Sequence, residues 1–138
     1  EWINKIFEII KQCPHHRFIF LTKVPEKLNY QFPDNCAVGV TVNRSADLDR
    51  IRILKNIVSS VKFVSFEPVY ERIKPDLSGI QWIMIGAQTG PKEFQPKKEW
   101  IDDIIESARN AKCNVFIKDN LDYETKIVEF PSGLYLNS

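Results

Sequence analysis

An acidic and a basic residue each stand directly after a short, largely apolar run in this sequence. Glu67 follows the run Val61–Phe66, and Lys118 follows the run Val115–Ile117. A carboxylate at the end of a buried strand suits general acid–base chemistry or ligand binding. A lysine in such a place provides a cation for an anionic ligand or, once deprotonated, a nucleophilic amine. The structural alternatives are an ion pair of Glu67 with Lys118 or Lys23, and a lysine whose ammonium only reaches solvent.

Polar residues follow every run that is predicted to be a buried strand. They are Thr22-Lys23, Asn43-Arg44, Ser65 with Glu67, Gln88-Thr89 and Lys118-Asp119. Because the carboxyl ends of parallel strands open onto one rim, we expect these residues to converge there despite their separation in sequence. The candidate catalytic residues are Glu67 and Lys118, and the candidate ligand-binding residues are Lys23, Asn43, Ser65, Gly86, Gln88 and Thr89. A solvated rim of polar caps is the alternative interpretation.

Two glycines in the stretch Gly86–Gly90 allow backbone amides to approach an anion closely. The stretch matches neither a Walker motif nor the pattern GxGxxG, so a tight turn before Pro91 is the simpler interpretation. No metal site is predicted, because His15 and His16 point apart in an extended chain and have no third ligand near them. The cysteines are widely spaced and form no zinc, cluster or disulfide pattern.

Short apolar runs alternate along the chain with segments of helical periodicity. The expected strands cover residues 17–21, 36–42, 61–66, 80–85 and 114–118, each buried. The expected helices cover residues 1–12, 25–28, 45–58 and 96–108. The third of these helices is expected to follow an N-cap at Ser45 and to pack through Leu48, Ile51, Leu54, Ile57 and Val58. In the tail, residues 121–138, short edge strands are expected over residues 127–130 and 134–136.

This alternation predicts parallel βα units. The unit length resembles that of (β/α) barrels, whose eight units need about 250 residues, so five strands are too few to close one. The predicted fold class is α/β, a partial (β/α) TIM-like barrel of about five parallel strands with flanking helices. It forms a single domain over residues 1–138. Because an open barrel leaves strand edges unpaired, we expect a homo-oligomer or the tail to cover them.

Composition excludes several classes of function. The formal net charge of +1 gives no electrostatic footprint for nucleic acid or an anionic membrane. No apolar run approaches the roughly 20 residues of a membrane span, and no signal peptide is visible. We therefore expect a cytoplasmic protein in which Cys13, Cys36 and Cys113 are reduced and mostly buried.

Short motifs in a fixed order resemble those of an uncharacterised, phage-type protein family that is itself similar to a divergent radical-SAM (β/α) barrel. The motifs are Phe20–Glu26, Val38–Val42, Ser65–Pro68, Trp82–Gly86 with Thr89–Pro91, and Phe116–Lys118. The resemblance runs from about Arg17 to Asp119. It implies that this chain is the C-terminal portion of a longer barrel protein. That longer parent protein is expected to bind S-adenosylmethionine and a [4Fe-4S] cluster.

The resemblance carries over Lys23, Ser65, Glu67 and Lys118 as rim residues. The family pattern has acids where this chain has Asn43 and Gln88. The chain itself lacks closely spaced cysteines, so no cofactor is expected in it and the fragment is expected to be inactive.

Two other functions are compatible with the residues. The first is a cofactor-free barrel lyase, in which Lys118 or Lys23 forms a Schiff base with a small carbonyl compound and Glu67 acts as acid–base. The second is a non-catalytic binding or assembly domain.

Overall fold

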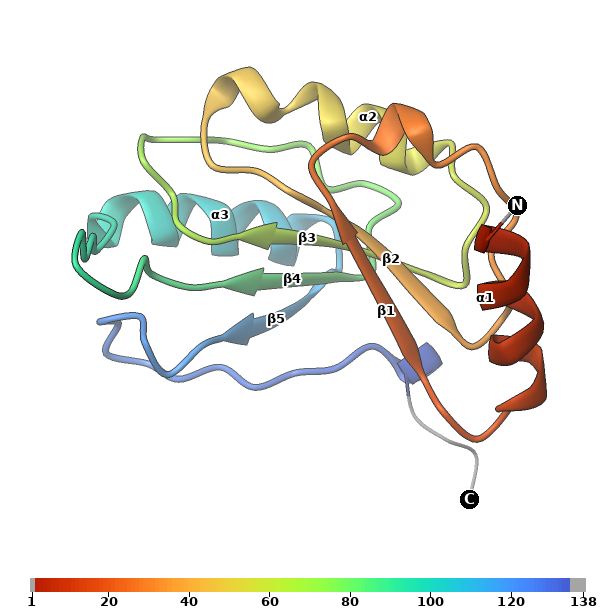
Figure 1. Cartoon of the computed structure of the whole chain (residues 1–138). Helices are drawn as coiled ribbons and strands as arrows, with labels where there is room; N and C mark the ends of the chain where they lie inside the picture. The colour runs from red at the N-terminus through yellow and green to blue at the C-terminus, as the bar shows by residue number, and fades with distance from the viewer. Residues whose placement is uncertain (1, 135–138) are drawn as a thin grey trace.

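The computed structural model describes residues 2–134 of the chain (Figure 1). A five-stranded sheet forms its centre, and all strand pairs are parallel. The strands are β1 (Phe18–Thr22), β2 (Cys36–Thr41), β3 (Val61–Phe66), β4 (Trp82–Ile85) and β5 (Asn114–Ile117). The α-helices are α1 (Trp2–Gln12), α2 (Asp49–Lys55) and α3 (Lys98–Asn110). Three 3-10 turns are described as well, namely η1 (Pro25–Lys27), η2 (Ser45–Asp47) and η3 (Ser132–Leu134).

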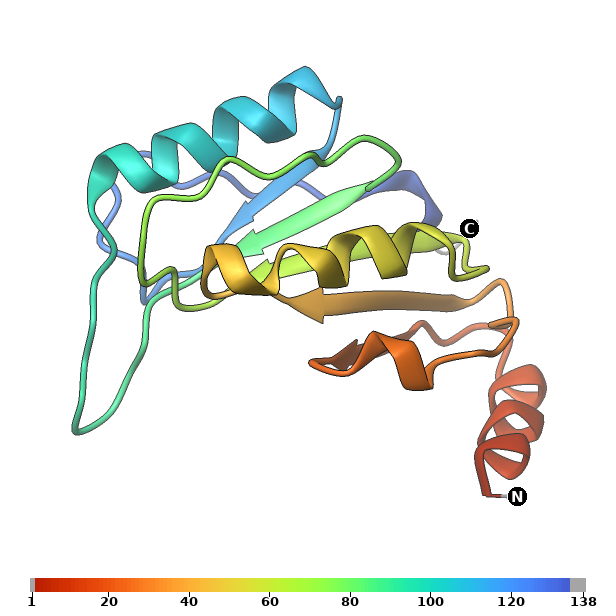
Figure 2. The same cartoon turned by 90° about the horizontal axis from the view of Figure 1, so that it is seen from above.

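The strands lie in the sheet in the order of the sequence, β1-β2-β3-β4-β5. With right-handed connections, this order places every connecting segment on the same face, whereas a doubly wound sheet reverses its order at a switch point. Seen from above, α2 and α3 lie over the same face (Figure 2). Within the described residues β1 and β5 do not pair with each other, so the sheet is open. The predicted α/β class is confirmed, and the sheet is compatible with a partial (β/α) barrel.

Alternate side chains of each strand point to opposite faces of the sheet. One face, here called the helix face, carries side chains such as Val40, Val64 and Ile83, which pack against α2 and α3 in the main core. The connection from β3 to β4 contains no helix in the described chain, and its buried Ile73 and Leu77 cover the same face. The opposite face is here called the open face.

The open face has a smaller core of its own. Ala37, Val61, Phe63 and Trp82 are buried in it, and Leu134 of the tail packs against them. This layer therefore forms a second packed core on the side of the sheet that none of the described α-helices covers.

The tail returns along β5 in the antiparallel direction. The Ile117 amide donates to the Ile127 carbonyl (2.8 Å), and the Glu129 amide donates to the Val115 carbonyl (2.9 Å). An isolated antiparallel bridge thus stands where the strand over residues 127–130 was expected. Leu134 ends η3 rather than starting a strand, and residues 135–136 of the last expected strand lie outside the described residues.

Three local expectations were wrong. β1 is not buried on both faces, because Ile19 and Leu21 are 54% and 52% exposed at the uncovered edge of the open face. Ser45 is not the N-cap of a long helix, because Asp47 accepts hydrogen bonds from two preceding amides and closes the turn η2 before α2 begins. Val58 lies beyond the end of α2 and is exposed. None of the described helices is both long and apolar enough to cross a membrane.

A carboxylate holds the tail on β5, and this contact yields a pH prediction. Glu129 accepts two hydrogen bonds from the Arg109 guanidinium (2.7 and 3.0 Å) and one from the Val115 amide (2.9 Å). The hydrogen bond from Arg109, followed by that from Val115, holds the pKa of Glu129 below its usual range against the opposing effect of burial. The contribution of Glu129 to stability is complete above the ordinary glutamate pKa of about 4.3 and is lost as the pH falls through the lower folded pKa.

We therefore expect Glu129→Gln to speed hydrogen exchange at the Ile117 and Glu129 amides near pH 7. Glu106→Gln on α3 is the matched control, because Glu106 is exposed and makes no ion pair within the described residues. Equal exchange rates in both variants would contradict the role of Glu129 in holding the tail.

Candidate functional site

The carboxyl ends of β2 and β3 present polar side chains on the open face. The strand register pairs Thr41 with Ser65, so the two residues are neighbours, and Glu67 follows two positions later on the β3 side. Since side chains at i and i+2 share a face of a strand, Ser65 and Glu67 point to the same side. This group of side chains, together with Lys118, is here called the open-face polar row.

Glu67 and Lys118 form an ion pair across the sheet. Their strands, β3 and β5, are separated by β4 and therefore lie about 10 Å apart. The Glu67 and Lys118 side chains are 26% and 38% exposed, so the pair is partly screened by solvent. Of the sequence-based alternatives for Glu67, the ion pair with Lys118 is present, and the one with Lys23 is absent from the described residues.

Gly86 lies between the two charged residues. Its amide donates to the Phe66 carbonyl (3.1 Å), and the Lys118 amide donates to the Ile85 carbonyl (2.9 Å), so the strand ladder continues through this row. A Cβ atom on Gly86 would lie only 2.9 Å from Cδ of Glu67. The absence of a side chain at this position therefore lets the Glu67 carboxylate pass over β4 and reach Lys118.

Thr41 and Ser65 lie beside this ion pair in buried positions. The two residues are only 7% and 3% exposed. Neither hydroxyl makes a hydrogen bond within the described residues, although the Thr41 carbonyl accepts from Arg50 Nη1 (2.8 Å) and the Ser65 carbonyl accepts from the Val42 amide (2.9 Å). Neither hydroxyl oxygen is a buried atom left without a partner, so both reach the surface of the open face.

The stretch after β4 leads into a loop that an antiparallel bridge between Gln88 and Phe94 closes, and the amides at its start are occupied. The Ala87 amide donates to Oδ1 of Asn120 (3.3 Å), and the Gln88 amide donates to the Phe94 carbonyl (3.1 Å). Together with the bond from Gly86 to Phe66, this leaves no amide of residues 86–88 for an anion. These bonds count against an anion cradle at residues 86–88, and a loop over residues 88–94 stands where a tight turn before Pro91 was expected.

The other predicted site residues lie near the same edge but serve the loops. Asn43 donates from Nδ2 to the Pro68 carbonyl (2.7 Å), and Gln88 accepts from the Tyr70 hydroxyl through Oε1. Thr89 is exposed in the turn, and Lys23 is exposed just beyond β1. In the described residues neither Lys23 nor Thr89 contributes a side-chain hydrogen bond or ion pair. The structure therefore brings together only part of the predicted set, namely Ser65, Glu67, Gly86 and Lys118.

Two residues near the site were missed in the sequence. Thr41 belongs to the open-face polar row, and Asn120 pairs with both backbone groups of Ala87, donating from Nδ2 to its carbonyl at 3.0 Å. Thr41 carried a signal, because it is the polar residue in the otherwise apolar stretch Val38–Val42. Asn120 lies in a loop, and no pattern in the sequence indicated its role.

The cysteines do not form a metal centre. No cluster of three or more His, Cys, Asp or Glu side chains suited to a metal ion occurs in residues 2–134. Burial raises the pKa of the Cys36 thiol to about 11 and that of Cys113 to about 12. These thiols are therefore protonated at neutral pH, whereas metal ligation requires thiolates. The three residues do not fit an iron–sulfur cluster in this chain.

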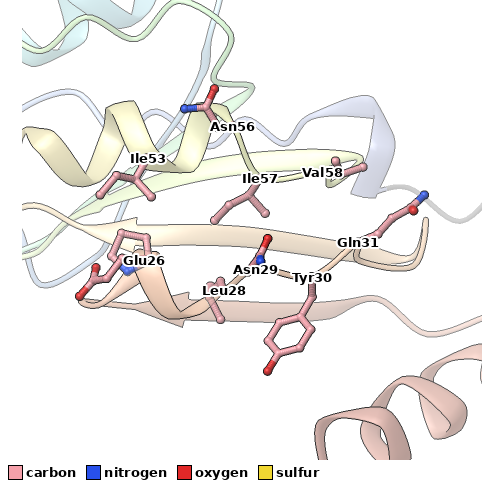
Figure 3. A pocket seen from close by; sticks show the side chains of 10 residues that line it. Glu26, Leu28, Asn29, Tyr30, Gln31, Ile53, Asn56, Ile57 and Val58 are labelled. Carbon is pink, nitrogen blue, oxygen red and sulfur yellow. The ribbon is translucent and has the colours of Figure 1, made fainter.

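A cleft of about 430 Å³ opens on the helix side of the molecule rather than on the open face. Figure 3 shows side chains from the segment after η1, such as Leu28 and Asn29, facing Ile53 of α2 and the nearby Ile57. Its lining mixes apolar and amide groups and includes no part of the open-face polar row. The cleft is thus a separate candidate binding place, and ligand binding there can be distinguished from binding on the open face.

The fold and the open-face polar row define an α/β protein with an open, barrel-like parallel sheet and a charged pair at the carboxyl edge of its strands. A family model described as "Protein of unknown function (DUF5131)" matches residues 1–130, and the chain belongs to this family. No curated protein and no solved structure matches the chain significantly.

Proposed function

We propose that the chain is the C-terminal part of a (β/α)-barrel enzyme that binds a small molecule at the carboxyl ends of its strands. One observation carries this proposal, namely that Glu67 reaches Lys118 across Gly86 on the open face, which none of the α-helices in residues 2–134 covers. The lack of a Cβ atom at Gly86 leaves room for the Glu67 carboxylate to cross β4, and a merely solvated rim has no use for such room. In this role Glu67 accepts or donates a proton at the ligand, and Lys118 holds the carboxylate in place.

The test uses the full chain and a ligand panel of small carboxylates, sugar phosphates, amino acids, nucleosides and S-adenosylmethionine. At least one compound should raise the melting temperature, and Glu67→Gln and Lys118→Met should each weaken that response about tenfold or more. Glu93→Gln and Lys92→Met are matched controls, since both residues are exposed and form no ion pair within the described chain. A response that is equally strong in all four variants would place the ligand elsewhere.

The resemblance to radical-SAM barrels supports a parent enzyme of that class in the cytoplasm. S-adenosylmethionine bound by such a parent would supply a radical precursor. The cysteines of this chain do not fit a cluster, so we assign them no part in its binding and derive no step through it. Iron and sulfide analysis of an anaerobically purified longer protein tests this part of the proposal, and an iron-free protein would count against it.

The lyase alternative is less well supported. A Schiff base needs a lysine amine that is free to attack a carbonyl group, whereas the Lys118 amine is held in an ion pair by the Glu67 carboxylate. Borohydride trapping with a carbonyl compound distinguishes the two, because only the lyase yields a stable lysine adduct.

An assembly role has one specific observation in its favour. The outer edge of β1 is unpaired within the described chain, and Ile19 and Leu21 are more than half exposed beside it. A second copy that pairs at β1 would cover both features. Sedimentation distinguishes this alternative, because a monomer at high concentration would exclude it.

A further inference from the structure

The two outer strands of the sheet differ in what lies beside them. At β5 the tail returns antiparallel and bonds to the backbone of Val115 and Ile117 (2.9 and 2.8 Å). At β1 no strand lies beside the outer edge within residues 2–134. An unpaired strand edge offers a row of backbone donors and acceptors to another segment. The chain therefore covers one edge of its sheet by itself, and the edge at β1 is open to a further strand.

The backbone groups that face outward from β1 can be assigned. The Phe18 amide donates to the Asn35 carbonyl (3.0 Å), so Phe18 turns its backbone groups toward β2. In a parallel ladder alternate residues turn these groups to opposite sides, so those of Ile19 and Leu21 face outward. The side chains of the same two residues are more than half exposed on the open face. The sites for backbone pairing thus coincide with the exposed apolar side chains of β1.

Helix α1 lies where the connection to such a strand belongs. Figure 2 shows α1 beyond β1, on the side away from β2. Phe7 and Ile10 of α1 pack toward the main core, and the Phe7 ring contacts the Phe32 ring at a centroid distance of 5.3 Å. Trp2 and Ile9, in contrast, are 75% and 56% exposed. The described sheet therefore covers only part of the apolar surface of α1.

The strand order indicates which segment pairs with β1. All four strand pairs are parallel and follow the order of the sequence. Right-handed connections over one face place each strand beside its successor. The same rule, applied to α1, places the strand before α1 next to β1 and parallel to it. A second copy related by a two-fold axis would instead pair the two β1 strands antiparallel, unlike every pair of named strands in this sheet.

We infer that a strand from the part of the longer protein that directly precedes α1 occupies the outer edge of β1. This inference rests on the proposed function, because it names the segment that continues the barrel around the same site. The added strand pairs with the outward backbone groups of Ile19 and Leu21. Its side chains alternate between the open face, beside these two residues, and the helix face, beneath α1. Both sets are therefore apolar, as in a strand that is buried on both faces.

The experiment compares amide hydrogen exchange in this chain with exchange in the complete product of the reading frame that encodes it. The Ile19 and Leu21 amides should exchange about a hundredfold more slowly in the longer protein, because each gains a backbone partner. The Phe18 amide is the internal control, because Asn35 already accepts from it in this chain. Equal exchange at Ile19 and Leu21 in both proteins would overturn the inference, and so would a product with no strand before α1.

A substitution and a dilution series test whether the partner belongs to the same protein. Leu21→Asp should leave the melting temperature of this chain almost unchanged but lower that of the longer protein by several degrees, because the side chain is buried only there. Val58→Asp is the matched control, since Val58 is 58% exposed beyond α2 and should respond equally in both proteins. Protection of Ile19 and Leu21 that rises with the concentration of this chain would show a second copy at the edge and overturn the inference.

The outcomes are distinct from those that decide the ligand site. Unchanged exchange at β1, together with a panel compound that depends on Glu67 and Lys118, would overturn this inference and leave ligand binding in place. Protection at β1 without any such compound would support the added strand, whereas the ligand-binding part of the proposed function would fail.

Discussion

Replacing Phe63 with alanine should lower the free energy of unfolding by about 3–5 kcal/mol. Phe63 is 0% exposed although no α-helix of the described chain covers its side of the sheet. Its ring occupies the space where a Cβ atom of Gly39 would lie, at 2.5 Å, and it contacts the Trp82 ring at a centroid distance of 5.7 Å. Removing it leaves a cavity beside a glycine, which has no side chain with which to fill that cavity. Chemical denaturation followed by circular dichroism measures the loss.

The control for this substitution is Phe130→Ala in the tail. Phe130 also contacts Trp82, but it is 41% exposed, so less buried surface is lost. We expect a clearly smaller destabilisation for this control. Equal losses would mean that Phe63 is not part of a packed core on the open face. Packing of Phe63 would then not hold Ser65 and Glu67 in position.

Replacing Gly86 with alanine should lower the free energy of unfolding by up to about 1 kcal/mol, because the outer part of the flexible Glu67 side chain has to move aside and its partly exposed ion pair with Lys118 is then lost. The clash is with Cδ and Cγ of Glu67, at 2.9 and 3.1 Å. Removing those atoms should remove the clash. In a chain that already carries Glu67→Ala, the same Gly86→Ala change should therefore cost clearly less.

The four chains of this double-mutant cycle measure the coupling between the two positions. Denaturant midpoints at fixed pH provide the four free energies. A cost of Gly86→Ala that is independent of residue 67 would mean that Gly86 serves the backbone of the turn. Gly86 would then have no part in making room for the ion pair.

The sheet could be predicted from the sequence because its strands carry strong local signals. Runs such as Phe18–Leu21 and Val61–Phe66 are short, apolar and rich in β-branched or aromatic residues, and helical segments separate them. Their parallel order follows from these connections. The exposure of Ile19 and Leu21 could not be predicted, because it depends on β1 being the uncovered edge of an open sheet.

The candidate site was only partly predictable, for a geometric reason. Glu67 and Lys118 were found because each ends a strand, and the common edge of parallel strands brings such residues together. Thr41 was missed, because its position on the open face matters only once the helices are known to cover the other face. The role of Gly86 was missed as well, since it depends on a side chain that crosses an intervening strand.

The most direct test uses the compound of the ligand panel that raises the melting temperature of the protein most. The amide chemical-shift changes that this compound causes are mapped onto the chain. The account predicts that the largest shifts fall at Thr41, Ser65, Glu67, Gly86 and Lys118. Shifts concentrated instead in the helix-side cleft, over residues 25–31 and 53–58, would contradict it.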